Sequence, residues 1–228
     1  MEAKETLAGV IVPFLKTQFP KEIQTPLPSP IPATPALLGS WARITSILSN
    51  VLSVSSLFPL VDMWRLAVLD SQVAVFLSNT TNTPDPFSIL IGKATTVVLN
   101  PSQNTHTYML TLLRFLANGF SCSSLARRIV GEARDSVTAL LIPALLCDNS
   151  SVRMAAASLT FNVAVCVRNG RLDKALKRDG QGDSDKQGDW EIELVTALIE
   201  AIARENENED TSESITSLVG FILLGDTT

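Results

Sequence analysis

The amino-acid sequence predicts an all-α fold, a stack of helical repeats of the armadillo or HEAT type. Apolar residues recur at intervals of three and four through most of the 228 residues, and no segment alternates apolar and polar residues for long enough to form a strand. Hydrophobic residues make up 46% of the chain and aromatic residues only 6%, which favours a core of Leu, Val, Ile and Ala between packed helices. Two long apolar segments also resemble each other at the repeat distance of such stacks.

The N-terminal part of the chain is predicted to be a helix and a proline-rich connector. An apolar stripe over residues 5–19 indicates the helix. Five prolines follow between Pro26 and Pro35, and each removes a backbone donor and biases the residue before it away from helix. We therefore divide the chain into residues 1–33 and a helical domain over residues 34–228.

The helical domain is predicted to begin at Thr34, whose hydroxyl caps a helix with Pro35 in its first turn. One stripe of this helix is expected to be buried, namely Leu38, Trp41, Ile44, Leu48 and Val51. Helical spacing predicts further helices over residues 57–69, 70–78, 87–99, 104–120, 125–129, 136–146, 152–167, 190–204 and 211–224. The segment 177–189 is rich in Gly and Asp and is predicted to be a surface loop.

Two of the long helices carry an internal repeat. The segments TYMLTLLRFLANGF and RMAAASLTFNVAVC each have one asparagine near the middle, and Asn118 and Asn162 lie 44 residues apart. Stacked units of this kind form a concave face that holds an extended peptide, and an asparagine amide both donates to and accepts from a peptide backbone. Arg114 lies one turn before Asn118. The asparagines are therefore predicted either to line a groove or to bond the ends of neighbouring helices.

Four segments, in order, resemble the PUL domain. They are LFPLVDMWRLAVLD, LLRFLANGF, AAASLTFNVAVC and SLVGFILLGD, and the resemblance runs from about residue 34 to the C-terminus. The PUL domain is found at the C-terminus of the phospholipase-activating protein that handles ubiquitin, and in fungi after PPPDE peptidase-like and thioredoxin-like domains. The resemblance implies an armadillo-like fold that binds the acidic, extended C-terminal tail of the AAA ATPase of the valosin-containing protein type.

The resemblance also nominates binding residues. Arg65 falls in the family's D-[LIM]-x-R-L helix, Arg114 and Asn118 fall in its L-R-x-[FL]-x-N helix, and Asn162 falls in its L-x-x-N helix. The alternative for Arg65 is an ion pair with Asp62, three residues before it.

Two features depart from the family pattern. Thr216 stands where relatives often carry a basic residue, and the chain stops at Thr228 where relatives continue with one or two helices. Either the domain is truncated at its C-terminus or its last repeat is missing, and in both cases we expect an uncovered apolar face at that end.

The distribution of charge permits an acidic partner. The net charge of −5 gives no general attraction to nucleic acid or anionic lipid, and the acidic residues gather late in the chain. Basic residues outnumber acidic ones between residues 114 and 178, and a minority of them are expected to face a groove. They are Arg127, Arg128, Arg134, Arg153, Arg168, Arg171, Lys174 and Lys177.

The sequence predicts no catalysis, cofactor or metal. His106 is the only histidine, Cys122 is the nearest cysteine to it in sequence, and no turn typical of an oxyanion hole lies between them. Cys122, Cys147 and Cys166 lack metal-site spacing and are expected to be small buried side chains in a reducing compartment. The segment DGQGDSD lacks the final glutamate of a calcium loop.

These expectations favour a monomeric, non-catalytic binding module of the cytoplasm or nucleus. No apolar run reaches the roughly 18 residues of a membrane span. The alternative function is a helical scaffold or an accessory domain of a thiol peptidase or thioredoxin-containing protein.

Overall fold

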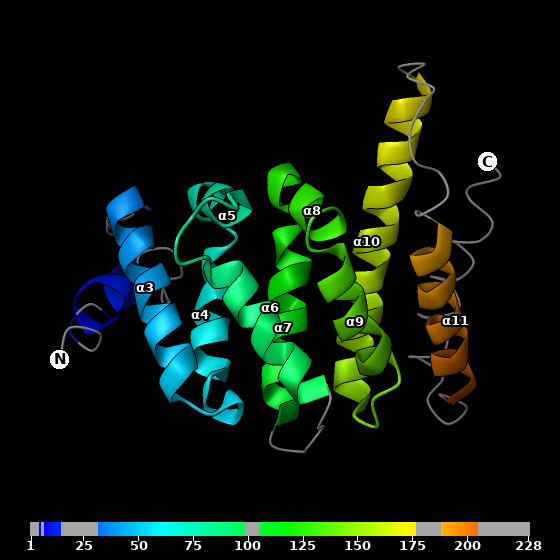
Figure 1. The fold of residues 1–228 in the computed structure, drawn as a ribbon, viewed down its shortest axis with the longest axis horizontal. Helices are drawn as coiled ribbons and strands as arrows, with labels where there is room; N and C mark the ends of the chain where they lie inside the picture. Colours follow the sequence, from blue (N-terminus) through cyan, green and yellow to red (C-terminus); the bar gives the residue numbers. More distant parts are fainter. Residues whose placement is uncertain (1–4, 6, 15–31, 99–104, 177–187, 205–228) are drawn as a thin grey trace, which may run out of the picture.

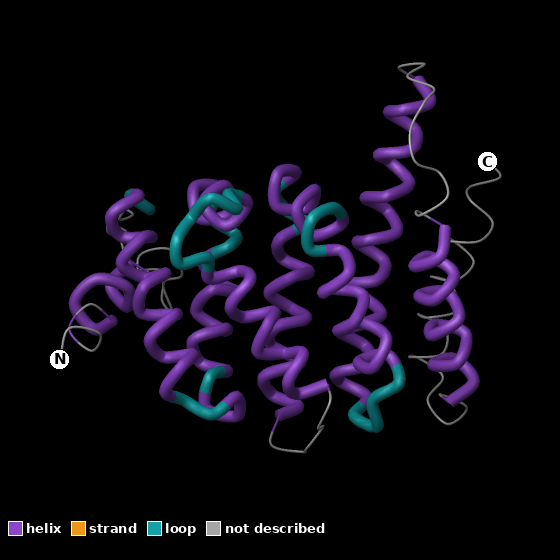
Figure 2. Tube along the Cα trace, viewed as in Figure 1, coloured by secondary structure: helices purple, strands orange, loops and turns teal. Residues whose placement is uncertain are grey.

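The computed structural model describes residues 5, 7–14, 32–98, 105–176 and 188–204, and within these ranges every regular element is a helix (Figure 2). The elements are η1 (Leu7–Ile11), α3 (Pro35–Val51), η2 (Val54–Ser56), α4 (Phe58–Ala67), α5 (Ser71–Ser78), α6 (Pro86–Val98), α7 (His106–Gly119), α8 (Ser123–Val130), α9 (Arg134–Leu145), α10 (Ser150–Leu176) and α11 (Gly188–Arg204). The predicted all-α class is confirmed.

The helices form two antiparallel rows (Figure 1). Helices α3, α6, α9 and α11 contact one another in that order and make the first row, and α4, α7 and α10 make the second row. The short helices α5 and α8 contact each other at one end of the stack. The repeating element is therefore a three-helix unit, as in armadillo repeats, with α5–α7 as the second unit and α8–α10 as the third. Helices α3 and α4 occupy the last two positions of a first unit.

Local sequence signals set the helix starts where the sequence analysis expects them. The Thr34 hydroxyl accepts a hydrogen bond from the backbone N–H of Leu37, 3.3 Å away, and Pro35 opens α3. The Asp70 carboxylate caps α5 by accepting from the N–H groups of Gln72 and Val73. Each cap satisfies donors that the first helical turn leaves without a partner.

Two expectations about α3 and α11 are wrong in detail. Val51, expected in the buried stripe, is 76% exposed, because it is the last residue of α3 and lies at the rim of the stack. Gly188 and Asp189, expected in the acidic loop, belong to the first turn of α11.

The expectations for residues 15–19, 177–187 and 211–224 lie outside the described residues. Within residues 5–19, a π-turn at Leu7–Ile11 packs against α3. Ile11 and Phe14 are buried, and the Phe14 ring meets Trp41 edge to face at 6.4 Å.

A pair of tryptophans fills the first unit. Trp41 of α3 stacks on Trp64 of α4 with ring centroids 4.0 Å apart, and both side chains are fully buried. The indole N–H of Trp64 donates to the Thr45 hydroxyl at 2.9 Å, and that hydroxyl donates to the Trp41 carbonyl. The rings thus supply the bulk of this part of the core while the Trp64 polar atom keeps a partner.

Helix α10 corrects the expectation about apolar runs. By length and composition alone, the stretch Ser150–Gly170 suffices to cross a membrane, with a mean hydropathy of 1.3. In the structure this helix packs against α7, α8, α9 and α11 and buries Val152, Ala156 and Leu159. The stack covers part of this helix, and 39% of the apolar stretch is buried.

Candidate functional site

Two asparagine side chains join the helices of the second row. The Asn118 amide donates to the Arg65 carbonyl at 2.9 Å, and the Asn162 amide donates to the Ala117 carbonyl at 3.5 Å. Both carbonyls lie in the last turn of their helix, and the Ala117 carbonyl also accepts a hydrogen bond from the backbone N–H of Phe120. Of the two alternatives in the sequence analysis, bonding of neighbouring helix ends is thus observed. Each bond uses only the amide N–H₂ group, and the side-chain oxygen remains an acceptor.

These two bonds fix the register of the row. The acceptors Arg65 and Ala117 are equivalent, and so are the donors Asn118 and Asn162. Because Ala117 precedes Asn118 and Phe161 precedes Asn162, the residues Arg65, Ala117 and Phe161 occupy one position on α4, α7 and α10. One residue before that position, Trp64, Leu116 and Thr160 are all fully buried, which agrees with this register. Three residues before it stand Asp62, Arg114 and Ser158. The same backbone geometry therefore presents a different side chain at each unit.

The four nominated residues come from this single row. Arg65 is half-buried, and its Nε donates to the Asp62 carboxylate at 2.6 Å, so the alternative of an ion pair is observed. Arg114 is exposed on α7, one turn before Asn118. Arg65 and Asn118 are in direct contact through the Arg65 carbonyl, and Asn162 lies on the next helix.

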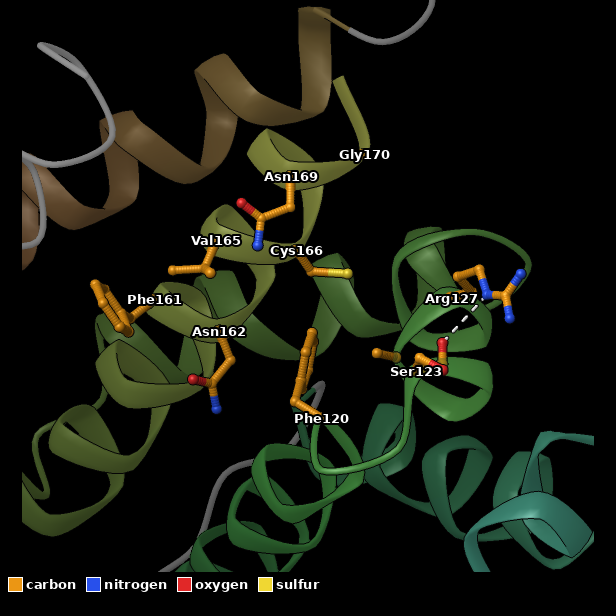
Figure 3. A pocket seen from close by; sticks show the side chains of 10 residues that line it. Phe120, Ser123, Arg127, Phe161, Asn162, Val165, Cys166, Asn169 and Gly170 are labelled. Carbon is orange, nitrogen blue, oxygen red and sulfur yellow. Dashed lines mark hydrogen bonds between the residues drawn. The ribbon is translucent and has the colours of Figure 1, made fainter. Parts of the chain in front are cut away.

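The row forms a face that is hollowed at one end. A cleft of about 580 Å³ lies where the end of α7, helix α8 and helix α10 meet. Figure 3 shows Asn162 with the ring of Phe161 on one side and the ring of Phe120 on the other. Sequence reasoning found Asn162 but missed the two rings. Phe161 continues an apolar run, and nothing in the run indicates that this ring is 42% exposed.

The basic residues divide between structure and surface. Arg128, counted among the basic residues that give the locally positive surface, is buried: its guanidinium donates to the Leu77 carbonyl at 2.5 Å, forms an ion pair with Asp85 and lies over the Phe87 ring. Arg153 donates to the Cys147 carbonyl at 2.7 Å. Neither guanidinium is presented to a peptide by this geometry.

Arg127 behaves differently from its neighbour Arg128. It is exposed at the cleft, and its Nε donates to the Ser123 carbonyl at 3.3 Å. The two residues are adjacent in sequence, but a helix turns about 100° between them, so only one faces the interior.

The cysteines are half-buried rather than the fully buried side chains expected from the sequence. The neighbour of His106 is Cys147, with 3.7 Å between Nε2 and Sγ, and not Cys122. Burial raises the pKa of the Cys166 thiol, and the nearby Arg127 charge opposes that effect only in part. Within the described residues, no three His, Cys, Asp or Glu side chains cluster as a metal site would require.

Comparison with known families identifies the fold. The family described as the PUL domain matches residues 33–222, which is most of the chain. The chain belongs to the PUL domain family. No curated protein and no solved structure matches it. A PUL domain is a protein-interaction module, so the site to be explained is a protein-binding surface.

Proposed function

We propose that this PUL domain binds the acidic C-terminal tail of the valosin-containing type of AAA ATPase along the second-row face, without catalysing a reaction. The observation that carries the proposal is that Arg114 and Asn118 lie on α7 and that Asn162 lies on the adjacent helix α10 of the same row. The Asn118 amide bonds α7 to α4, and the Asn162 amide bonds α10 to α7. Family membership supports the protein-binding role, and the identity of the tail follows from what the PUL resemblance implies.

The spacing of the row suits an extended chain. Packed helix axes lie about 8–10 Å apart, which is close to the span of three extended residues at about 3.3–3.6 Å each. A chain that crosses α7 and α10 therefore brings a backbone N–H to the Asn118 oxygen and another to the Asn162 oxygen about three residues later. We call the Asn118–Arg65 and Asn162–Ala117 hydrogen bonds the two latches, because each joins two neighbouring helices. They also hold both amides in a fixed orientation for this contact.

Charge attracts the tail chiefly at Arg114. Its guanidinium is exposed and offers paired donors to a carboxylate. Arg65 contributes less, because its Nε is engaged by Asp62, whose negative charge repels an acidic ligand. Arg114 is therefore the main cation of the proposed site.

The test is a titration of the folded domain with a labelled tail peptide, read by fluorescence anisotropy. We expect micromolar affinity that weakens as salt rises, because the attraction between charges is screened. Arg114→Ala should weaken binding severalfold, and Arg134→Ala, which removes an arginine from first-row helix α9, should not. Absence of binding by a protein with the expected helical circular dichroism would exclude the proposed partner.

A second candidate function rests on the contact between Cys147 and His106. It is the accessory role in a thiol peptidase or thioredoxin-containing protein. A reactive thiolate would alkylate rapidly with iodoacetamide in the folded protein, and His106→Gln would slow that reaction. We expect instead that all three cysteines react slowly, since each is half-buried in the folded protein.

A further inference from the structure

The cleft at the end of the second row differs from the rest of the face in shape and chemistry. Its walls come from the last turn of α7, from α8 and from α10. We propose that this cleft is a subsite for an apolar side chain of the bound peptide, next to a carboxylate that Arg127 receives. The inference rests on the proposed function, because it assigns a sequence preference to the same peptide-binding face.

Apolar surface dominates the middle of the cleft. Phe120 is half-buried, Phe161 is 42% exposed, and Val165 is half-buried one turn after Phe161. Cys166 adds a thiol whose pKa is raised by burial, so that it stays protonated and uncharged at neutral pH. Aromatic rings around a hollow are the usual environment of an apolar anchor residue, because its burial there removes apolar surface from water.

Amide groups border this apolar surface along α10. Asn162 lies between the two phenylalanine rings, and exposed Asn169 lies seven residues further, on the same side of the helix (Figure 3). Seven helical residues rise about 10.5 Å, or about three residues of an extended chain. A peptide that bonds both amides with its backbone therefore places the intervening side chains over the cleft.

One cation marks the rim. Among the described residues that line the cleft, Arg127 is the charged one, and none carries a carboxylate. Its bond to the Ser123 carbonyl uses Nε and steadies the side chain, while the guanidinium has five donors in all. The complementary group is a carboxylate, either of an acidic side chain or of the end of the peptide.

The equivalent positions in the other units carry different side chains. Where α10 presents Phe161, α4 presents Arg65 in its ion pair and α7 presents the small Ala117. The face is thus polar and charged at Arg114 and apolar at the third unit. A ligand that uses both ends carries an acidic stretch and, about three residues away, an apolar side chain.

The first experiment measures the affinity of the whole chain for the tail peptide by fluorescence anisotropy, in wild type, Phe161→Ser and Phe58→Ser. Phe58 is the matched control, because it is an aromatic residue of the same row with 40% exposure outside the cleft. We expect Phe161→Ser to weaken binding about tenfold or more, as befits loss of an apolar contact, and Phe58→Ser to change it less than about twofold. Phe161→Leu should restore most of the affinity, which separates loss of the apolar wall from loss of folding.

Failure of the inference and failure of the proposed function give different results. Tail binding that Arg114→Ala weakens and Phe161→Ser leaves unchanged overturns the subsite but keeps the function. If Phe161→Ser and Phe58→Ser weaken peptide binding equally, the subsite is overturned too, because the effect is then not local to the cleft. Tail binding that is absent from the wild type rejects the function itself.

The second experiment identifies the residue that enters the cleft. Each apolar residue of the tail peptide is replaced by Ser in turn, and each peptide is prepared with a free and an amidated C-terminus. One replacement should weaken binding to the wild type about tenfold and leave binding to Phe161→Ser unchanged. If amidation weakens binding in the wild type but not in Arg127→Gln, Arg127 receives the terminal carboxylate. If a Glu→Gln or Asp→Asn substitution in the peptide weakens binding to the wild type but not to Arg127→Gln, Arg127 receives an acidic side chain. If no peptide shows this difference, the role proposed for Arg127 is wrong.

Discussion

The first and third units are built on the same two-row geometry and yet differ in how they are filled and held. In the first unit, two tryptophans stack in the core and the Arg65 carbonyl is latched at 2.9 Å. In the third, Thr160 takes the place of Trp64, the latch from Asn162 is 3.5 Å long, and a cleft opens beside it. The third unit is also joined to the second by Arg128 of α8, which bonds the Leu77 carbonyl and pairs with Asp85.

The difference shows how a repeat keeps its backbone while its surface diversifies. The latched register requires only a carbonyl and an asparagine amide, so the outward positions are free to carry Arg65, Ala117 or Phe161. We expect stability to depend on the tryptophan pair of the first unit and on Arg128, whereas recognition is proposed for the second-row face.

The largest effect is expected where the third unit is fastened. Arg128→Met removes the buried partner of Asp85 and leaves the Leu77 carbonyl without this donor, so the free energy of unfolding should fall by about 3–5 kcal/mol. Urea denaturation followed by circular dichroism measures it. Arg127→Met is the adjacent control and should change the free energy of unfolding by less than about 0.5 kcal/mol. Similar losses of the free energy of unfolding in both variants would mean that Arg128 does not hold the third unit in place.

A smaller loss is expected from the core hydroxyl of the first unit. Thr45→Val leaves the buried indole N–H of Trp64 without its acceptor, which should lower the free energy of unfolding by about 1–3 kcal/mol. Thr160→Val is the matched change in the third unit, because that buried hydroxyl bonds only the Ala156 carbonyl of its own helix. Its loss should be clearly smaller in the same urea titration, and the reverse order would contradict the comparison of the two cores.

The two latches provide a direct comparison of units. Asn118→Leu, which copies the residue found at the equivalent position of α4, should lower the free energy of unfolding by about 1 kcal/mol. Asn162→Leu should lower it less, because its bond is longer and the Ala117 carbonyl also accepts from the Phe120 N–H. Thermal and urea unfolding of both variants test this order. Equal losses would show that bond length does not distinguish the latches.

The smallest effect is expected in the second unit, at the sole tyrosine of the chain. Tyr108 donates to the Leu90 carbonyl at 2.7 Å, and burial raises its pKa above the ordinary range. Above about pH 10 the unfolded chain loses the phenolic proton while the folded chain keeps it, so stability falls as pH rises, by roughly 0.4 kcal/mol at pH 10. Tyr108→Phe should lack this alkaline loss. Phenolate absorbance that appears at pH 10 in the folded protein would contradict the assignment.

The helices that carry the nominated residues could be predicted because their signals are local or repeated. The repeat and the resemblance placed Arg65, Arg114, Asn118 and Asn162 on long helices, and the structure puts those helices in one row. Their partners could not be predicted, because the Asn118 bond to Arg65 spans 53 residues and the Asn162 bond to Ala117 spans 45. The cleft was missed for the same reason, since it needs the end of α7, α8 and α10 together.

The sequence by itself determined the helices and their order. Apolar spacing and the caps at Thr34 and Asp70 act within a few residues of themselves, so they can be read along the chain. Tertiary structure decided which side chains are buried. Arg127 and Arg128 are the same residue type in adjacent positions, and one faces solvent while the other is buried against Asp85, because only packing determines which face of a helix meets the stack.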